Sequence, residues 1–150
     1  PTDQQTTPMI HLFVYGTLLS DIPSSMSKFL RRRGKLIGKA SVAGTLYDMG
    51  MYPGFVAGGS GTVKGELYRL EGDNAKESLS MIDAYESVTG AGNDEYRRIT
   101  IKGRVSDGGP FEAFTYEIRK KPRGMPEIPR GNYSAFFKGN KEHQRFVNGG

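Results

Sequence analysis

The chain has 150 residues, of which 36% are hydrophobic and 25% charged, enough for one compact core and little more. It contains no cysteine and two histidines, which excludes disulfides, thiolate metal sites and cysteine nucleophiles and argues against a histidine metal site. The net charge of +5 is spread along the chain and forms no basic arm, so nucleic-acid binding is disfavoured.

The longest apolar stretch, residues 10–15, is far shorter than the roughly 20 residues that a membrane span needs, so we expect no membrane partner. The first residues lack a basic segment followed by an apolar one, so nothing in the given chain predicts a secretory signal. The sequence therefore indicates a cytoplasmic protein. It leaves the oligomeric state open.

The first predicted elements are a strand and a helix. Residues 10–15 form an apolar, β-rich run that ends at Gly16, as a buried strand does where it enters a loop. Apolar residues then recur at helical spacing, and Ser20 or Asp21 can cap this helix before Gly34 closes it. Residues 1–9 are expected to be disordered or extended.

Three consecutive arginines, residues 31–33, fall in the last turn of this helix. Cations there interact favourably with the negative end of the helix dipole, which is the interpretation we prefer. A patch for nucleic acid or an acidic partner is the alternative.

The middle of the chain predicts strands at 35–47 and 62–70, with a turn at 52–55. The glycine cluster at 58–61 is interpreted as a turn, because no helix and no Gly-Lys-Ser/Thr ending follows it as in a phosphate-binding loop. A second helix begins near Asn74, where Glu77 has capping-box spacing.

The remaining chain predicts a loop at 90–94 and a hairpin of strands 96–102 and 111–118 joined through 106–109. Three prolines exclude regular structure from 120–130, and a short helix or turn is expected at 133–137. The order of elements indicates the α+β class with a mainly antiparallel sheet. We expect one domain over 10–140 and a flexible tail over 141–150.

Glu86 is unusual within the second helix. The apolar face of this helix, projected forward from Leu79 and Ile82, arrives at Glu86, which places a carboxylate toward the core. Desolvation would raise its pKa toward neutrality, as a general acid/base working near pH 7 requires. The alternative is a structural glutamate that turns to solvent or pairs with Arg98.

A second candidate feature is the turn Tyr15-Gly16-Thr17-Leu18. A buried strand that stops at Gly16 leaves the following amide N–H groups without ladder partners, so the turn can present them to a carboxylate or carbonyl oxygen. Glycine also removes a side chain that would block the approach of a ligand.

Three segments together resemble the gamma-glutamylcyclotransferase-like family: Tyr15 to Leu18, then 82–86 (Ile-Asp-Ala-Tyr-Glu), then 96–98 (Tyr-Arg-Arg). The similarity covers about residues 10–118 in the same order. It implies a small, mixed, mainly antiparallel β-barrel with two or three helices. The family implies a cavity that holds a glutamate above the Tyr-Gly-Thr-Leu loop.

The resemblance also implies roles for individual residues. Glu86 matches the catalytic general acid/base, Tyr15, Gly16, Thr17 and Leu18 match the substrate-binding loop, and Tyr96 matches a tyrosine near the cavity. Supporting roles are expected for Arg98 and Tyr116. In one departure, Ser87 follows Glu86 where the family usually has glycine, and serine adopts positive φ reluctantly.

The implied reaction cyclises a γ-glutamyl amide to 5-oxoproline and releases a free amine, with a small-molecule γ-glutamyl substrate and no metal or organic cofactor. A catalytically inactive small-molecule-binding or regulatory domain on the same fold is the main alternative, favoured by Ser87. A nucleic-acid-binding barrel is a further one, based on the net charge and on the tyrosines. We expect those tyrosines instead to line a cavity or the core: Tyr47, Tyr52, Tyr68 and Tyr116.

Overall fold

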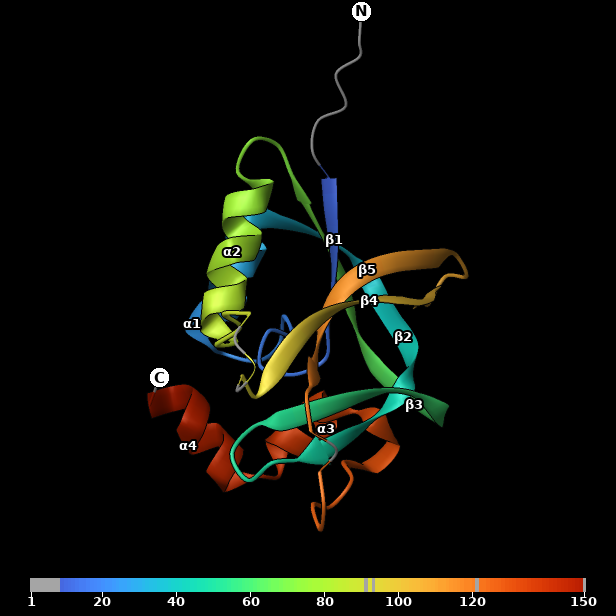
Figure 1. Ribbon diagram of the computed structural model, residues 1–150, viewed down its shortest axis with the longest axis vertical. Helices are drawn as coiled ribbons and strands as arrows, with labels where there is room; N and C mark the ends of the chain where they lie inside the picture. The colour runs from blue at the N-terminus through green and yellow to red at the C-terminus, as the bar shows by residue number, and fades with distance from the viewer. Residues whose placement is uncertain (1–8, 91, 93, 121, 150) are drawn as a thin grey trace, which may run out of the picture.

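The computed structural model describes residues 9–90, 92, 94–120 and 122–149. Five strands close into a barrel in the order β1-β3-β2-β4-β5 (Figure 1). Their bounds are β1 Met9–Val14, β2 Gly34–Asp48, β3 Pro53–Glu71, β4 Tyr96–Val105 and β5 Pro110–Ile118. Neighbouring strands are antiparallel except for the β1–β5 pair, which closes the barrel in parallel. The predicted mixed, mainly antiparallel barrel is therefore confirmed.

The helices lie around the barrel, with α1 and α2 along one side and α3 and α4 near one end (Figure 1). Their bounds are α1 Ser25–Arg33, α2 Ala75–Tyr85, α3 Tyr133–Lys138 and α4 Lys141–Gly149, and a short 3₁₀ helix, η1, spans Pro129–Gly131. The described residues thus hold four α-helices, where two or three were expected. No helix in this part of the chain has the length and apolar character needed to cross a membrane.

Helix α1 begins later than predicted. Ser24, and not Ser20 or Asp21, is its N-cap: the Ser24 hydroxyl accepts a hydrogen bond from the Ser27 N–H and donates one to the Thr17 carbonyl. The hydroxyl of Ser20 instead donates a hydrogen bond to the carboxylate of Glu66. The arginines of the last turn are where we expected them.

The β2–β3 hairpin is also longer than predicted. Strand β3 begins at Pro53, so the expected turn at 52–55 is mostly strand. Residues 58–61 belong to the same strand but fall between two consecutive pairs, Gly44 with Ala57 and Ala43 with Thr62. The glycines there bulge out and are exposed, with φ of +93° at Gly58 and +81° at Gly59.

The capping box predicted for α2 is absent. Asn74 is the N-cap but its side chain makes no capping hydrogen bond, and Glu77 lies near Arg33 of α1 instead, at 3.6 Å. The contact connects the two helices on one side of the barrel.

The tail predicted to be flexible from 141 onward forms α4. His143 in this helix is fully buried, accepts or donates a hydrogen bond with the Tyr133 hydroxyl at 2.8 Å, and contacts Asp48 at 2.7 Å through its other ring nitrogen. Val147 is also buried. The sequence analysis missed helix α4 because a single histidine in a polar segment gives no local sign that it will be buried against distant residues. The expected disorder at 1–8 lies outside the described residues, and Met9 begins β1.

Candidate active site

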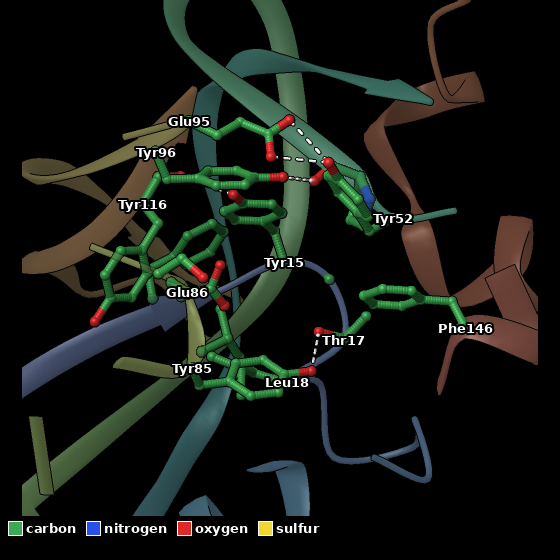
Figure 2. Close-up of a pocket in the computed structure, with 15 residues that line it drawn as sticks. Tyr15, Thr17, Leu18, Tyr52, Tyr85, Glu86, Glu95, Tyr96, Tyr116 and Phe146 are labelled. Atoms are coloured by element: carbon green, nitrogen blue, oxygen red, sulfur yellow. Dashed lines mark hydrogen bonds between the residues drawn. The ribbon is translucent and has the colours of Figure 1, made fainter. Parts of the chain in front are cut away.

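One cavity of about 310 Å³ opens at an end of β1 and is lined by side chains from distant parts of the chain (Figure 2). It brings together seven of the eight residues selected from the sequence: Tyr15, Gly16, Thr17, Leu18, Glu86, Tyr96 and Tyr116. The other lining residues are Phe13, Val14, Tyr52, Pro53, Tyr85, Ser87, Glu95 and Phe146. A cavity of this size can take a small molecule.

Glu86 is held by the end of α2. It is the C-cap residue, one position beyond the helix, and not a residue of the last helical turn as the projection assumed. The Ser87 N–H donates to the Ala84 carbonyl and the Val88 N–H to the Asp83 carbonyl, both at 3.0 Å or less. These two bonds form a Schellman motif, whose left-handed position is Ser87 with φ of 59°.

The carboxyl of Glu86 forms no hydrogen bond or ion pair with any residue that the structure describes. Its accessible surface faces the cavity. Burial raises its pKa from 4.5 to about 7, and the negative charge of Asp83 adds to this effect. A carboxyl with this pKa can exchange a proton near neutral pH, although Glu86 lies just beyond the helix face from which the sequence analysis inferred this.

Arg98 does not pair with Glu86. Its guanidinium forms an ion pair with Asp83 at 2.5 Å and lies over the ring of Phe114. The hydroxyl of Tyr116 donates to the other oxygen of Asp83 at 2.6 Å. Arg98 and Tyr116 therefore hold Asp83 beside Glu86, while only Tyr116 lines the cavity.

The loop after β1 supplies backbone donors. Its carbonyls are engaged, since Gly16 O accepts from the Leu19 N–H and Thr17 O from the Ser24 hydroxyl. No hydrogen bond among the described residues uses the N–H groups of Gly16, Thr17 and Leu18. These N–H groups thus have no protein partner in a loop that lines the cavity, which leaves them available to the oxygen atoms of a ligand.

Gly16 has a packing reason as well. A Cβ atom at this position would lie 2.6 Å from Cγ of Pro53, the first residue of β3. Any side chain would force the loop away from the strand that forms the opposite wall. The glycine is required by this close approach.

The tyrosines of the cavity use their hydroxyls to hold the walls together. Tyr15 donates to the Tyr116 carbonyl and Tyr96 to the Pro53 carbonyl, each at 2.7 Å, and the Thr17 hydroxyl lies 3.0 Å from the hydroxyl of Tyr85. Burial raises the pKa of Tyr15, Tyr96 and Tyr116, with nearby carboxylates adding to the effect, so all three remain neutral at pH 7.

Eight lining residues were not selected as site residues from the sequence, among them Tyr52, Tyr85, Glu95 and Phe146. Tyr52 was considered only as a cavity or core residue, and Glu95 lies between the predicted loop at 90–94 and the predicted strand at 96–102. Phe146 lies in α4, which was expected to be flexible. Tyr85 is the one of these residues that the sequence could have indicated as a site residue, because it directly precedes Glu86.

The described residues include no group of three or more histidine, aspartate or glutamate side chains arranged to hold a metal ion. The two histidines lie in different elements: His11 is on β1, and His143 in α4 is hydrogen-bonded to Tyr133 and contacts Asp48.

Comparison with known proteins gives a consistent picture. A family model described as "Gamma-glutamyl cyclotransferase, AIG2-like" matches residues 12–135. The chain is 37% identical over 125 residues to the gamma-glutamylcyclotransferase family protein YtfP of Escherichia coli strain K12, covering 83% of this chain and 96% of that protein. It is 34% identical over 110 residues to the gamma-L-glutamyl-butirosin B gamma-glutamyl cyclotransferase of Niallia circulans, covering 72% of this chain and 66% of that protein.

Solved structures share the fold. The uncharacterized protein PH0828 from Pyrococcus horikoshii is 26% identical with a TM-score of 0.61, over 85% of this chain and 92% of that one. An aig2-like protein from Mus musculus is 21% identical with a TM-score of 0.64, over 83% of this chain and 88% of that one.

Proposed function

Since this chain belongs to the gamma-glutamyl cyclotransferase, AIG2-like family, we propose that it cyclises a γ-glutamyl amide to 5-oxoproline and releases the free amine, with Glu86 as the general acid/base. The substrate is a small molecule. The residues proposed to bind it are Tyr15, Gly16, Thr17, Leu18 and Tyr96, with Tyr116 and Arg98 in support through Asp83.

One observation carries this proposal: an unpartnered carboxyl with a pKa of about 7 lines the same cavity as a loop of unused backbone donors. A carboxyl that stabilised the fold would have hydrogen-bond partners. A cavity that only bound a neutral ligand would have no need of a titrating group near pH 7. The pairing of the two features fits a reaction that transfers protons and stabilises a negative oxygen.

The reaction needs few groups because the nucleophile is part of the substrate. The α-nitrogen attacks the γ-carbonyl carbon, a C–N bond forms to close the ring, and the bond from that carbon to the amine nitrogen breaks. Holding the substrate in a folded conformation supplies much of the rate. Glu86 as carboxylate takes a proton from the α-ammonium group and, once protonated, gives one to the departing nitrogen.

The free N–H groups of residues 16–18 have the second role. They are suited to hold the α-carboxylate of the substrate or the oxygen that becomes negative when the carbonyl is attacked. The neutral hydroxyls of the wall tyrosines are already bonded to the protein. We therefore assign to Tyr15 and Tyr96 a part in binding that consists of shaping the cavity around the substrate and excluding water, and not of hydrogen bonds to it.

Ser87 bears on the alternative of an inactive binding domain. The serine adopts the left-handed conformation in which a glycine would be expected, with φ of 59°. The backbone that aims Glu86 is formed by two hydrogen bonds that do not involve the serine side chain. The departure from glycine therefore gives no structural reason for a loss of activity.

The test uses L-γ-glutamyl-methylamide and L-γ-glutamyl-alanine as substrates, with 5-oxoproline measured by chromatography. We expect Glu86→Gln to fold normally and to lose about 10²- to 10⁴-fold in kcat. Glu117→Gln, which changes a carboxylate outside the cavity, is the matched control and should retain activity. A wild-type rate in Glu86→Gln would refute the role of Glu86, and calorimetric binding without turnover in the wild-type protein would favour the inactive domain.

A further inference from the structure

A second cavity, of about 590 Å³, lies outside the barrel and shares no lining residue with the candidate active site. Its lining comes mainly from β2, β3, α3 and the loop between β1 and α1. We call this cavity the outer groove. The reaction steps proposed above make no use of it.

The register of β2 and β3 sets the floor of the outer groove. Lys39 is paired with Glu66, and Ser41 with Lys64. Residues two apart in a strand point to the same face, so these four side chains share one face of the hairpin. Lys39 and Lys64 are exposed, so this face points away from the interior of the barrel.

A close contact at Gly131 brings α3 over this face. A Cβ atom at Gly131 would lie 2.2 Å from the Thr62 carbonyl oxygen, and the φ of 59° also favours glycine. Asn132, the N-cap of α3, forms a β-bridge with Lys64. Lys138, the last residue of α3, therefore lines the same groove as Lys64.

The cations of the outer groove have no partners. The ammonium groups of Lys39, Lys64 and Lys138 form no ion pair and no hydrogen bond with any residue that the structure describes. The hydroxyls of Ser41 and Thr62 also line the groove and are unused within the same part of the chain. All five groups can donate hydrogen bonds to an anion.

The two carboxylates of the lining, in contrast, are engaged by the protein. The oxygens of the buried Glu66 accept from the N–H and the hydroxyl of Ser20, at 2.7 and 2.6 Å. Asp21 accepts from the Ser134 hydroxyl. These carboxylates hold the loop and α3 in place, so the groups left to meet a ligand are the lysines and the hydroxyls.

We propose that the outer groove is a second ligand site, for a small anion with two or more negative charges such as a phosphate group. Lys64 and Lys138 contact the anion, and Lys39 adds to the attraction. A cavity of this volume also has room for an organic part attached to the phosphate. The proposal does not depend on the proposed function, because it concerns a separate cavity.

The first experiment measures binding by calorimetry at pH 8 and constant ionic strength, with acetate, inorganic phosphate and pyrophosphate as probes. We expect Kd to fall in this order. Pyrophosphate should bind about tenfold more tightly than acetate, since each added exposed ion pair contributes up to about fivefold. Equal Kd values, or no saturable binding of pyrophosphate, would overturn the site.

Charge variants locate the binding. Lys64→Gln and Lys138→Gln should each weaken pyrophosphate binding by about fivefold. Lys102→Gln is the matched control, because Lys102 is exposed on β4 and lies outside the groove. An equal loss in all three variants would mean that the anion is attracted by the net charge alone, which would contradict the proposal.

A groove-filling variant separates the cavity from its charge. Ala135 is exposed on α3 and lines the groove, so Ala135→Phe places a ring there without changing any charge. It should abolish saturable binding of pyrophosphate, with thermal denaturation used to verify that the variant folds. Unchanged affinity would show that the anion does not occupy the groove.

The source of the phosphate is decided by comparing ribose 5-phosphate with inorganic phosphate in the wild-type protein. Tighter binding of the ester would support a site for a phosphorylated metabolite, since its organic part then contributes contacts. Tighter binding of inorganic phosphate would support a site for the free anion.

Discussion

Glu117 and Glu86 are two carboxylates of the same barrel in opposite situations. Glu117, on β5, is 8% exposed, and its oxygens accept hydrogen bonds from the Ala57 N–H and from Arg97, its cross-strand neighbour. Glu86 lies on no strand or helix, faces a cavity and has no hydrogen-bond partner in the described chain. A buried charge with partners stabilises a fold, whereas one without partners is in a position to react.

The largest expected effect is on the free energy of unfolding, which should change in opposite directions when Glu86 and Glu117 are each replaced by glutamine. In Glu86→Gln we expect the free energy of unfolding at pH 8 to rise by up to about 3 kcal/mol, because a rise of the pKa from 4.5 to about 7 is a cost of that size. In Glu117→Gln we expect it to fall by about 1–2 kcal/mol, since a charge-assisted bond is lost.

The contribution of Glu86 to the free energy of unfolding depends on pH, and its sign follows from the raised pKa. Between about pH 4.5 and 7 the folded protein holds a proton that the unfolded chain has released, so this group lowers stability through that window and costs a constant amount above it. The advantage of Glu86→Gln over the wild-type protein should thus vanish below pH 4.5. Urea denaturation from pH 4 to 8 measures it, and a loss of stability at pH 8 would mean that Glu86 has partners after all.

A smaller effect is expected from Asp83→Asn, which removes the charge beside Glu86 and frees the cation of Arg98. Both changes favour the ionised form of Glu86, so we expect its pKa to fall by roughly one unit while burial keeps it above 4.5. The carbon-13 shift of the Glu86 carboxyl, followed against pH, reports this without any substrate. An unchanged titration would show that Asp83 has no electrostatic influence on Glu86. Glu112→Gln, which removes an exposed carboxylate on β5, provides the control.

The smallest expected effect concerns the backbone that aims Glu86. Ser87→Gly relieves the left-handed conformation and should raise the free energy of unfolding by about 0.5–1 kcal/mol. Arg130→Gly is the matched control, because Arg130 has the same φ of 59° and does not line the cavity. Both should stabilise in thermal denaturation. Lower stability in Ser87→Gly alone would mean that the serine side chain supports the turn.

The sequence by itself determined the local features of this protein. The apolar run before Gly16 specified β1, and the helical period that leads to Glu86 indicated a desolvated carboxyl, because both depend on neighbours in the chain. The segments at residues 15–18, 82–86 and 96–98 were enough to suggest the family. These are short-range patterns, although the fold places Glu86 at the C-cap of α2 and not within the helix face that was projected.

Only the tertiary structure decided which distant groups meet. Arg98 pairs with Asp83 and not with Glu86, since β4 passes the last turn of α2 at that residue. Gly16 is required by Pro53, 37 positions away in the sequence numbering. Helix α4 packs against the barrel through His143, which contacts Asp48 and Tyr133, and this places Phe146 at the cavity. Contacts of this kind depend on barrel closure and on side-chain packing across it, for which a local pattern in the chain carries no signal.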